Sequence, residues 1–238
     1  MLRRSLGVGS VLLFLLLLKS GVRAEPTVTV ILAGNVMLGR GVAQALDGDW
    51  EAAFAGVEEW LQSSDVAFAN LESPLTIAAQ VGTGYDLRAH PKAVNALAGF
   101  DVVSIANNHA WDAGEAGLRQ TVQTLCRAGI VPAGDSREAA SVGDIVECQD
   151  VDVDGIRLLA FDDSGPGVDL DAAADIVATA AESSEPVVAS VHWGGEYQAE
   201  PSPRQEAIAA ALAGSGAALI VGYSSHVLQP VEWVGDTL

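Results

Sequence analysis

Basic residues are scarce in this sequence: its 238 residues contain 12 Lys and Arg against 31 Asp and Glu, a formal net charge of −19. A surface of this sign repels the phosphates of nucleic acids and the headgroups of anionic lipids. The composition therefore argues against both as partners. It also means that an anionic substrate would need a local cationic device, either a metal ion or a few arginines.

Cysteine is also scarce, since Cys126 and Cys148 are the only two in the chain. Their separation does not match the spacing of a cysteine metal site. In an oxidising compartment the two thiols could pair, and the sequence alone leaves a disulfide and two free thiols both open.

Long hydrophobic runs are missing after residue 24. The first 24 residues combine a short basic start, a leucine-rich stretch over residues 11–18, and Ala24, a small residue of the kind that signal peptidase accepts. Residues 1–24 are therefore predicted to be a signal peptide, which implies a secreted or extracytoplasmic protein. The apolar stretch is short for a membrane span, but an uncleaved anchor supported by Lys19 is the alternative.

The rest of the chain, residues 25–238, alternates between β-branched runs and segments of helical period, which predicts one α/β domain. Strands are expected at residues 27–33, 65–69, 101–105, 130–133, 186–191 and 217–221, a hairpin over 144–153 and 156–161, and a further strand from 231. Helices are expected at residues 50–62, 91–97, 115–127, 169–182 and 203–212. In the first helix Asp49 is the expected N-cap, and Phe54, Val57, Trp60 and Leu61 are the expected core face.

A strongly polar turn follows the third expected strand. Residues 104–114 place Asn107, Asn108, His109 and Asp112 within six positions, between a buried strand and a helix. Such strand-to-helix turns lie at the carboxyl edge of a sheet, where ligand sites gather. Two amides, an imidazole and a carboxylate can bind a metal, move a proton or orient a phosphate. The alternative is a turn held by its own side chains, with Asp112 capping the next helix.

Five strands in all end in polar residues. These are Asn35; Asn70 and Glu72; Asn108, His109 and Asp112; His192 and Glu196; and His226. If the strands are neighbours, their ends converge on one edge and could build a metal or phosphate centre. Each residue also has a structural alternative: His192 as a hydrogen-bonded core histidine, Glu72 as a turn acceptor, and Asn35 as a residue that tolerates a left-handed turn.

Five motifs occur in order along the chain. They are Gly-Asn-Val-Met-Leu-Gly-Arg at 34–40, Asn-Leu-Glu-Ser-Pro-Leu-Thr at 70–76, Asp-Val-Val-Ser-Ile-Ala-Asn-Asn-His at 101–109, His-Trp-Gly-Gly-Glu-Tyr at 192–197 and His-Val-Leu-Gln-Pro-Val-Glu at 226–232. Together they resemble the CapA-type poly-γ-glutamate capsule biosynthesis proteins. The resemblance implies a calcineurin-like metallophosphatase fold, an αββα sandwich with mixed β-sheets flanked by helices and a dinuclear metal edge. It also implies a role in making, exporting or anchoring an anionic γ-linked glutamate polymer at the cell surface.

The resemblance assigns a role to each polar residue. The metal ligands would be Asn35, Glu72, Asn108, His192 and His226, holding a divalent ion such as manganese, zinc or iron. His109 with Asp112 would form the catalytic acid, and Arg40, Asn70 and Glu196 would contact the substrate. The expected partner is the anionic polyglutamate-type polymer or its synthase complex at the membrane.

Two positions depart from the family pattern. Asn35 stands where the family usually has an aspartate, and Tyr223 stands where it has a histidine. A site short of one carboxylate and one imidazole binds a divalent ion more weakly. The chain also stops before the Leu-Gly-Asn-Phe segment expected next, so the domain is predicted to be incomplete at its C-terminus.

Three functions are compatible with these residues. The first is metal-assisted hydrolysis or transfer, in which the ion activates water and His109 donates a proton. The second is a non-catalytic accessory or binding subunit of a capsule-assembly complex, with an eroded site. The third, a general secreted metallophosphoesterase, ranks last because residues 32–35 offer no histidine for the paired Asp-x-His that would follow the first strand.

Overall fold

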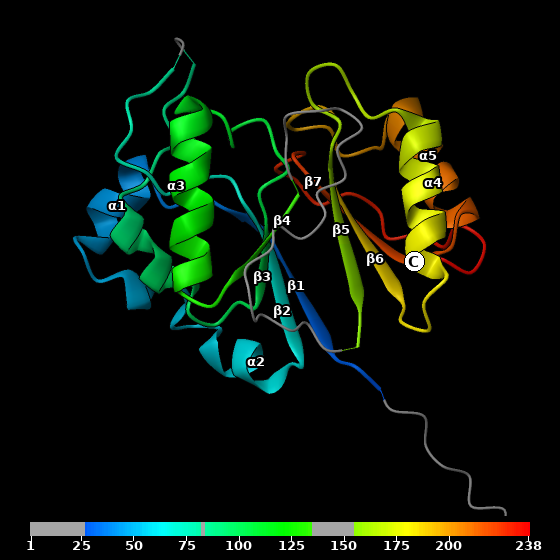
Figure 1. Ribbon diagram of the computed structural model, residues 1–238, viewed down its shortest axis with the longest axis horizontal. Helices are drawn as coiled ribbons and strands as arrows, with labels where there is room; N and C mark the ends of the chain where they lie inside the picture. The colour runs from blue at the N-terminus through cyan, green and yellow to red at the C-terminus, as the bar shows by residue number, and fades with distance from the viewer. Residues whose placement is uncertain (1–26, 82–83, 135–154) are drawn as a thin grey trace, which may run out of the picture.

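The computed structural model describes residues 27–81, 84–134 and 155–238 (Figure 1). Three expectations lie outside those ranges: the signal peptide at 1–24, the hairpin arm at 144–153, and any pairing of Cys126 with Cys148, since Cys148 is not among the described residues. These stay predictions. Within the described ranges no helix is both long enough and apolar enough to cross a membrane.

Two parallel sheets form the centre of the fold, with strand orders β1-β2-β3-β4 and β5-β6-β7. The strands are β1 (Val30–Val36), β2 (Val66–Leu71), β3 (Val102–Ser104), β4 (Val131–Ala133), β5 (Arg157–Asp162), β6 (Val187–His192) and β7 (Ala217–Tyr223). β2 and β6 are buried along their whole length, as expected for parallel strands covered on both faces. The resemblance implied mixed sheets, whereas all neighbouring pairs among these seven strands are parallel.

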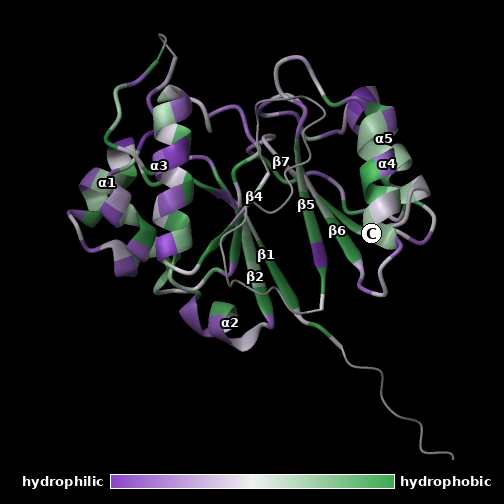
Figure 2. Cartoon of the chain, viewed as in Figure 1, coloured by the Kyte–Doolittle hydropathy of each residue, from purple (hydrophilic) through white to green (hydrophobic). Residues whose placement is uncertain are grey.

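Helices cover the outer face of each sheet, which confirms the expected αββα layering (Figure 1). The first sheet is covered by α1 (Arg40–Leu46), α2 (Glu58–Ser63), α3 (Gly114–Arg127) and the 3-10 helices η1 (Trp50–Phe54) and η2 (Pro91–Leu97). The second sheet is covered by α4 (Leu170–Ala181) and α5 (Pro203–Gly214). Figure 2 shows hydrophilic and hydrophobic residues alternating around α3, the pattern of a helix with one face on a core.

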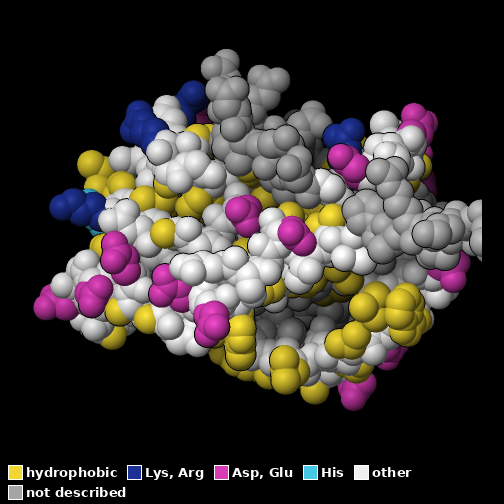
Figure 3. All heavy atoms as spheres, turned by 90° about the horizontal axis from the view of Figure 1, so that it is seen from below, with side chains coloured by type: hydrophobic (Ala, Val, Ile, Leu, Met, Phe, Trp, Pro, Cys, Tyr) yellow, Lys and Arg dark blue, Asp and Glu magenta, His cyan; other side chains and the backbone are white. Residues whose placement is uncertain are grey.

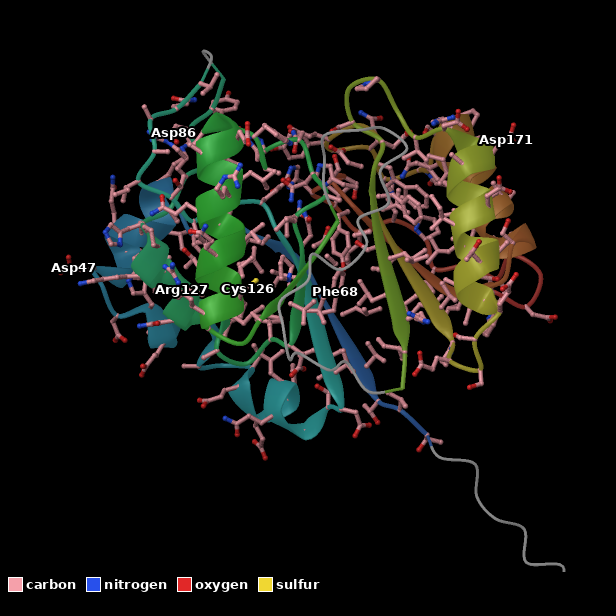
Figure 4. The ribbon with its side chains drawn as sticks, in the orientation of Figure 1. Asp47, Phe68, Asp86, Cys126, Arg127 and Asp171 are labelled. Atoms are coloured by element: carbon pink, nitrogen blue, oxygen red, sulfur yellow. The ribbon has the colours of Figure 1, made fainter. Side chains whose placement is uncertain are left out.

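A third apolar cluster fills the space between the two sheets. It joins Phe68 of β2 and Val102 of β3 to Leu158, Val188 and Tyr223 of the second sheet. Phe68 is fully buried there and is labelled in Figure 4. This inter-sheet core sets the two carboxyl edges side by side, which is what a shared site requires.

The single helix expected over residues 50–62 is wrong. The structure has η1, a break at Ala55 and Gly56, and then the short α2. Glycine inside a helix costs about 1 kcal/mol relative to alanine, and Asp49 does not compensate because its side chain makes no capping hydrogen bond. Leu61 is buried and Phe54 and Val57 pack against the same core, as predicted, but Trp60 is 67% exposed and does not take part in the expected core face.

The strand expected from residue 231 is also wrong. Val234 and Thr237 form an isolated antiparallel bridge, which makes this segment a turn. Only Leu238 pairs with β7: its N–H donates to the Ala218 carbonyl, and its carbonyl accepts from the Ile220 N–H. The apolar run that suggested a strand therefore lies on the surface, with Trp233 69% exposed.

Candidate functional site

Polar residues from both sheets meet at the carboxyl edge, which we call the rim: Asn35, Asn70, Glu72, Asn107, His109, His192, Glu196 and His226. The two sheets meet directly there, because Asn70 of β2 contacts His192 of β6. Register places Asn35 beside Asn70 in the first sheet, and His192 beside Tyr223 in the second. The convergence predicted from the polar strand ends is therefore present.

A chain of amide side chains crosses the rim. Nδ2 of Asn107 donates to Oδ1 of Asn70 over 3.1 Å, and Nδ2 of Asn70 donates to Oδ1 of Asn35 over 2.9 Å. Nδ2 of Asn70 also lies 3.4 Å from Nδ1 of His192. Asn70 and Asn107 are fully buried. Buried amide side chains are tolerated in a protein interior when their polar atoms are hydrogen-bonded, as they are here.

Glu72 and His192 face each other at the centre of the rim. Oε1 of Glu72 lies 3.8 Å from Nε2 of His192, which is longer than a hydrogen bond, and both side chains are buried. Nε2 is buried with no hydrogen-bond partner among the described residues. Glu72 and His192 therefore do not hydrogen-bond to each other, and Nε2 of His192 remains available to a further polar atom.

Burial sets the ionisation of this pair. It lowers the pKa of His192 to about 4, with His109 and His226 adding to the effect, so the ring is neutral at neutral pH. Burial also raises the pKa of Glu72, while His226 and His109 oppose that rise. Both groups are thus held toward their uncharged forms, and the two other histidines are close enough to act on both.

His109 is held by Asp112, as a proton-donating imidazole would be. Nδ1 of His109 lies 3.0 Å from Oδ2 of Asp112, and Oδ2 also accepts from the Leu87 N–H over 3.2 Å. The alternative in which Asp112 caps the following helix is wrong, because the N-cap of α3 is Ala113 and has no side-chain cap. Asp112 orients a rim histidine instead.

His226 and Glu196 form the exposed side of the rim. Nε2 of His226 lies 3.8 Å from Oε1 of Glu196, and the His226 ring is 6.0 Å from that of Tyr197. The Tyr197 N–H donates to the Ser225 carbonyl over 2.7 Å, which ties the two loops together.

Backbone strain is concentrated in the same loops. Among the described non-glycine residues with positive φ, Tyr197, Ser224 and His226 lie in the loops after β6 and β7 that carry the rim residues Glu196 and His226, and Arg40 is the first residue of α1. Such conformations cost of order 1–3 kcal/mol each and cluster at functional sites. The strain therefore marks the same segments as the polar motifs do.

Asn108 and Arg40 lie apart from this network. Asn108 is exposed, and its side chain makes no hydrogen bond to any described residue, whereas its neighbour Asn107 is the buried member of the amide chain. Arg40 is exposed and stacks over the Tyr85 ring at 5.2 Å. Asn107 was named in the polar turn, but the resemblance assigned a role to Asn108 only, and no signal in the sequence separates the two adjacent asparagines.

Tyr223 does not replace the missing imidazole. Its ring packs against Phe68 at 6.2 Å in the inter-sheet core, and its hydroxyl is buried without a hydrogen-bond partner in the described structure. Burial also raises the pKa of this hydroxyl, so it stays protonated. Compared with the histidine of the family pattern, Tyr223 adds a ring contact to the inter-sheet core and removes an imidazole from the rim.

Removing the Tyr223 hydroxyl should stabilise the protein. An unsatisfied buried polar group costs about 1–3 kcal/mol, so Tyr223→Phe is expected to raise the free energy of unfolding by about 1 kcal/mol. Urea denaturation at neutral pH measures the change. Tyr223→Leu, which also removes the ring contact with Phe68, should instead destabilise. Loss of stability in Tyr223→Phe would show that the hydroxyl is satisfied.

The residues of the rim do not fit a dinuclear metal centre. No group of three His, Cys, Asp or Glu side chains that could hold a metal ion occurs among residues 27–81, 84–134 and 155–238. Glu72 is the only carboxylate within 4 Å of His192 in those ranges, and Oδ1 of Asn35 is already used by Asn70. Asn35 and Tyr223, the two departures from the family pattern, account for a carboxylate and an imidazole that the site lacks.

Two stacked sheets between helices, with histidines and carboxylates at the carboxyl ends of the strands, define an α/β protein of the metallophosphatase-like class. The family model described as "bacterial capsule synthesis protein PGA_cap" matches residues 29–238, and the chain belongs to that family.

Similar proteins from several bacteria support the family assignment. The chain is 30% identical over 237 residues to the capsule biosynthesis protein CapA of Bacillus anthracis, covering 88% of this chain and 57% of that protein. It is 28% identical over 234 residues to the PGA biosynthesis protein CapA of Bacillus subtilis, covering 90% and 62%. A probable polyglutamine synthesis accessory protein of Mycobacterium tuberculosis is 29% identical over 268 residues, covering 86% and 70%. The chain thus spans less than two thirds of the length of the two Bacillus relatives.

Proposed function

We propose that this protein acts in the biosynthesis of a capsular γ-linked glutamate polymer at the cell envelope, as an accessory that binds the polymer at the rim. The observation that carries the proposal is the convergence of the family's motifs from both sheets on one edge, in a chain that the capsule synthesis family model matches from residue 29 to 238. The partners would be the polymer or its synthase complex, reached after export through a signal segment at residues 1–24.

The chemistry of the rim supports binding of such a polymer. Each repeat of a γ-linked glutamate chain offers an amide and a carboxylate. His226 is an exposed, protonatable group of the rim, Arg40 at the start of α1 is an exposed cation outside the rim network, and Glu196 can accept from an amide N–H. In the view of Figure 3 the acidic side chains are scattered and the Lys and Arg side chains lie near the edges, so the described residues on that face form no basic groove for an anionic polymer.

A second candidate is a metal-dependent hydrolase or transferase acting on the same polymer. It is favoured by the buried Nε2 of His192, which has no hydrogen-bond partner in the described part of the chain and faces Glu72. A divalent ion, manganese, zinc or iron, would supply polarisation of an acyl or phosphoryl oxygen. The role of the chain's own residues would be proton donation by His109, oriented by Asp112.

Binding in the presence of a chelator separates the two candidates. Purified protein is treated with EDTA and titrated with fluorescent poly-γ-glutamate, with poly-α-glutamate of equal length as the control for charge. The accessory function predicts saturable binding that prefers the γ-linked chain and is indifferent to EDTA. A double variant, Arg40→Gln with His226→Asn, should weaken that binding about tenfold, the loss expected for two polar contacts. Polymer cleavage that requires added metal would establish the second candidate instead, and equal affinity for both polymers would overturn the first.

A further inference from the structure

The amide chain at the rim determines which nitrogen of His192 carries the proton. Neutral histidine has one N–H, and the hydrogen-bond partners of an amide or imidazole side chain determine which of its atoms donates and which accepts. Here the partners at one end of the chain are backbone groups, whose donor and acceptor roles are fixed. The orientation of every side chain in the series can therefore be derived from that end.

Asn107 is the anchored end. Its Nδ2 lies 3.0 Å from the Leu71 carbonyl oxygen, and its Oδ1 lies 3.1 Å from the His109 backbone nitrogen. A carbonyl only accepts and a backbone N–H only donates. Rotating the Asn107 amide by half a turn would place two acceptors together at one position and two donors together at the other. The Asn107 side chain thus has one permitted orientation.

Asn70 follows from Asn107. The second hydrogen on Nδ2 of Asn107 is directed to Asn70 at 3.1 Å, so the Asn70 atom there is the oxygen. Nδ2 of Asn70 then lies on the other side, where one hydrogen goes to Oδ1 of Asn35 at 2.9 Å and the other toward Nδ1 of His192 at 3.4 Å. Nδ1 faces an N–H and has to accept.

We propose that Asn107, acting through Asn70, is a positioning residue that fixes His192 in the tautomer with its proton on Nε2. The ring then presents an N–H toward Oε1 of Glu72, 3.8 Å away, and has no lone pair on that side. A histidine that binds a metal ion must offer the lone pair of the nitrogen facing the ion. At this position the rim is accordingly built to donate a hydrogen bond to an oxygen acceptor, which is the role opposite to the metal ligation implied by the family resemblance.

Heteronuclear NMR at neutral pH reads the tautomer directly, because protonated and unprotonated imidazole nitrogens resonate at well-separated ¹⁵N frequencies. The His192 signals are assigned by their loss in His192→Asn. In the wild-type protein the proton is expected on Nε2. Finding it on Nδ1 would overturn the proposal without reference to polymer binding.

The variant Asn70→Asp tests whether the side chain at position 70 determines the tautomer of His192. A carboxylate at this position only accepts, so the His192 nitrogen facing it would have to donate, and the proton should move to Nδ1. Asn35→Asp is the matched control: it introduces the same charge at the neighbouring rim position but preserves the acceptor that Asn70 needs, so the proton should stay on Nε2. A tautomer that is unchanged in Asn70→Asp, or that switches in Asn35→Asp, would contradict the proposed relay.

Discussion

Replacing Asn107 by alanine is expected to lower the free energy of unfolding by about 3 kcal/mol. The side chain is fully buried and makes three hydrogen bonds, to Asn70, to the Leu71 carbonyl and from the His109 N–H. Removing one partner of a buried hydrogen bond costs about 1–3 kcal/mol because the other partner is left without water. Three bonds at the low end of that range give the expected loss, and the network makes their effects interdependent.

Asn108→Ala is the matched control for this prediction. It is the same substitution one residue later, at an exposed side chain that makes no hydrogen bond to the described residues. A surface substitution of this kind changes stability by less than about 0.5 kcal/mol. Urea denaturation of both variants measures the difference. Equal losses in the two variants would show that the buried amide chain does not stabilise the fold.

The sheets and the rim could be predicted because the signals for them are local. A β-branched run such as 101–105 or 186–191 favours a strand wherever the chain places it. In parallel sheets the carboxyl ends of neighbouring strands share an edge, so the polar residues after each run had to meet if the strands were neighbours. The core between the sheets then required only that these runs be apolar on both faces.

The roles of individual polar residues could not be predicted in the same way. Asn107 and Asn108 are chemically identical and adjacent, and it is the contacts of Asn107 with Asn70 and with the Leu71 carbonyl, both from another strand, that distinguish the buried residue from the exposed one. The sequence also showed that Asn35 replaces the aspartate usual in the family, but it did not show that Asn35 would accept a hydrogen bond from Asn70. Hydrogen-bond direction across three strands is a tertiary property, and no sequence period encodes it.

The failed helix at 50–62 has a different cause. Periodicity placed Trp60 on the same face as Phe54, but the break at Ala55 and Gly56 starts α2 in a new register, and Trp60 lies exposed one position before the buried Leu61. Helical period is informative only while the helix is continuous. A glycine near the middle of a short amphipathic segment was the available warning.

Acidification should weaken the fold through His192. Its pKa in the folded protein is about 4, against about 6.5 for an unperturbed histidine, so the unfolded chain takes up a proton over this range while the folded protein does not. The contribution of neutral His192 to the free energy of unfolding is therefore fully present above pH 6.5 and is lost as the pH falls toward 4. A difference of about 2.5 pKa units corresponds to a loss of about 3 kcal/mol.

Glu72 opposes this loss within the same range. Its pKa is raised in the folded state, so the folded protein binds that proton more readily than the unfolded chain, and the unfavourable burial of its charge is relieved as the pH falls. The net acid sensitivity of the protein is therefore smaller than the His192 contribution alone. Isolating that contribution requires a variant that removes the imidazole and leaves Glu72 in place.

His192→Asn is that variant, because Oδ1 of the new amide can accept from Asn70 as Nδ1 does but does not titrate. The wild-type protein and the variant are unfolded by urea at several pH values between 4 and 7. Relative to the wild type, the variant should gain about 3 kcal/mol in stability on going from pH 7 to pH 4, since only the wild-type unfolded chain gains the proton. NMR titration of wild-type His192 should give a midpoint near 4. A midpoint near 6.5, with parallel stability profiles for the two proteins, would mean that the ring is hydrated and that the buried rim described above is open to water.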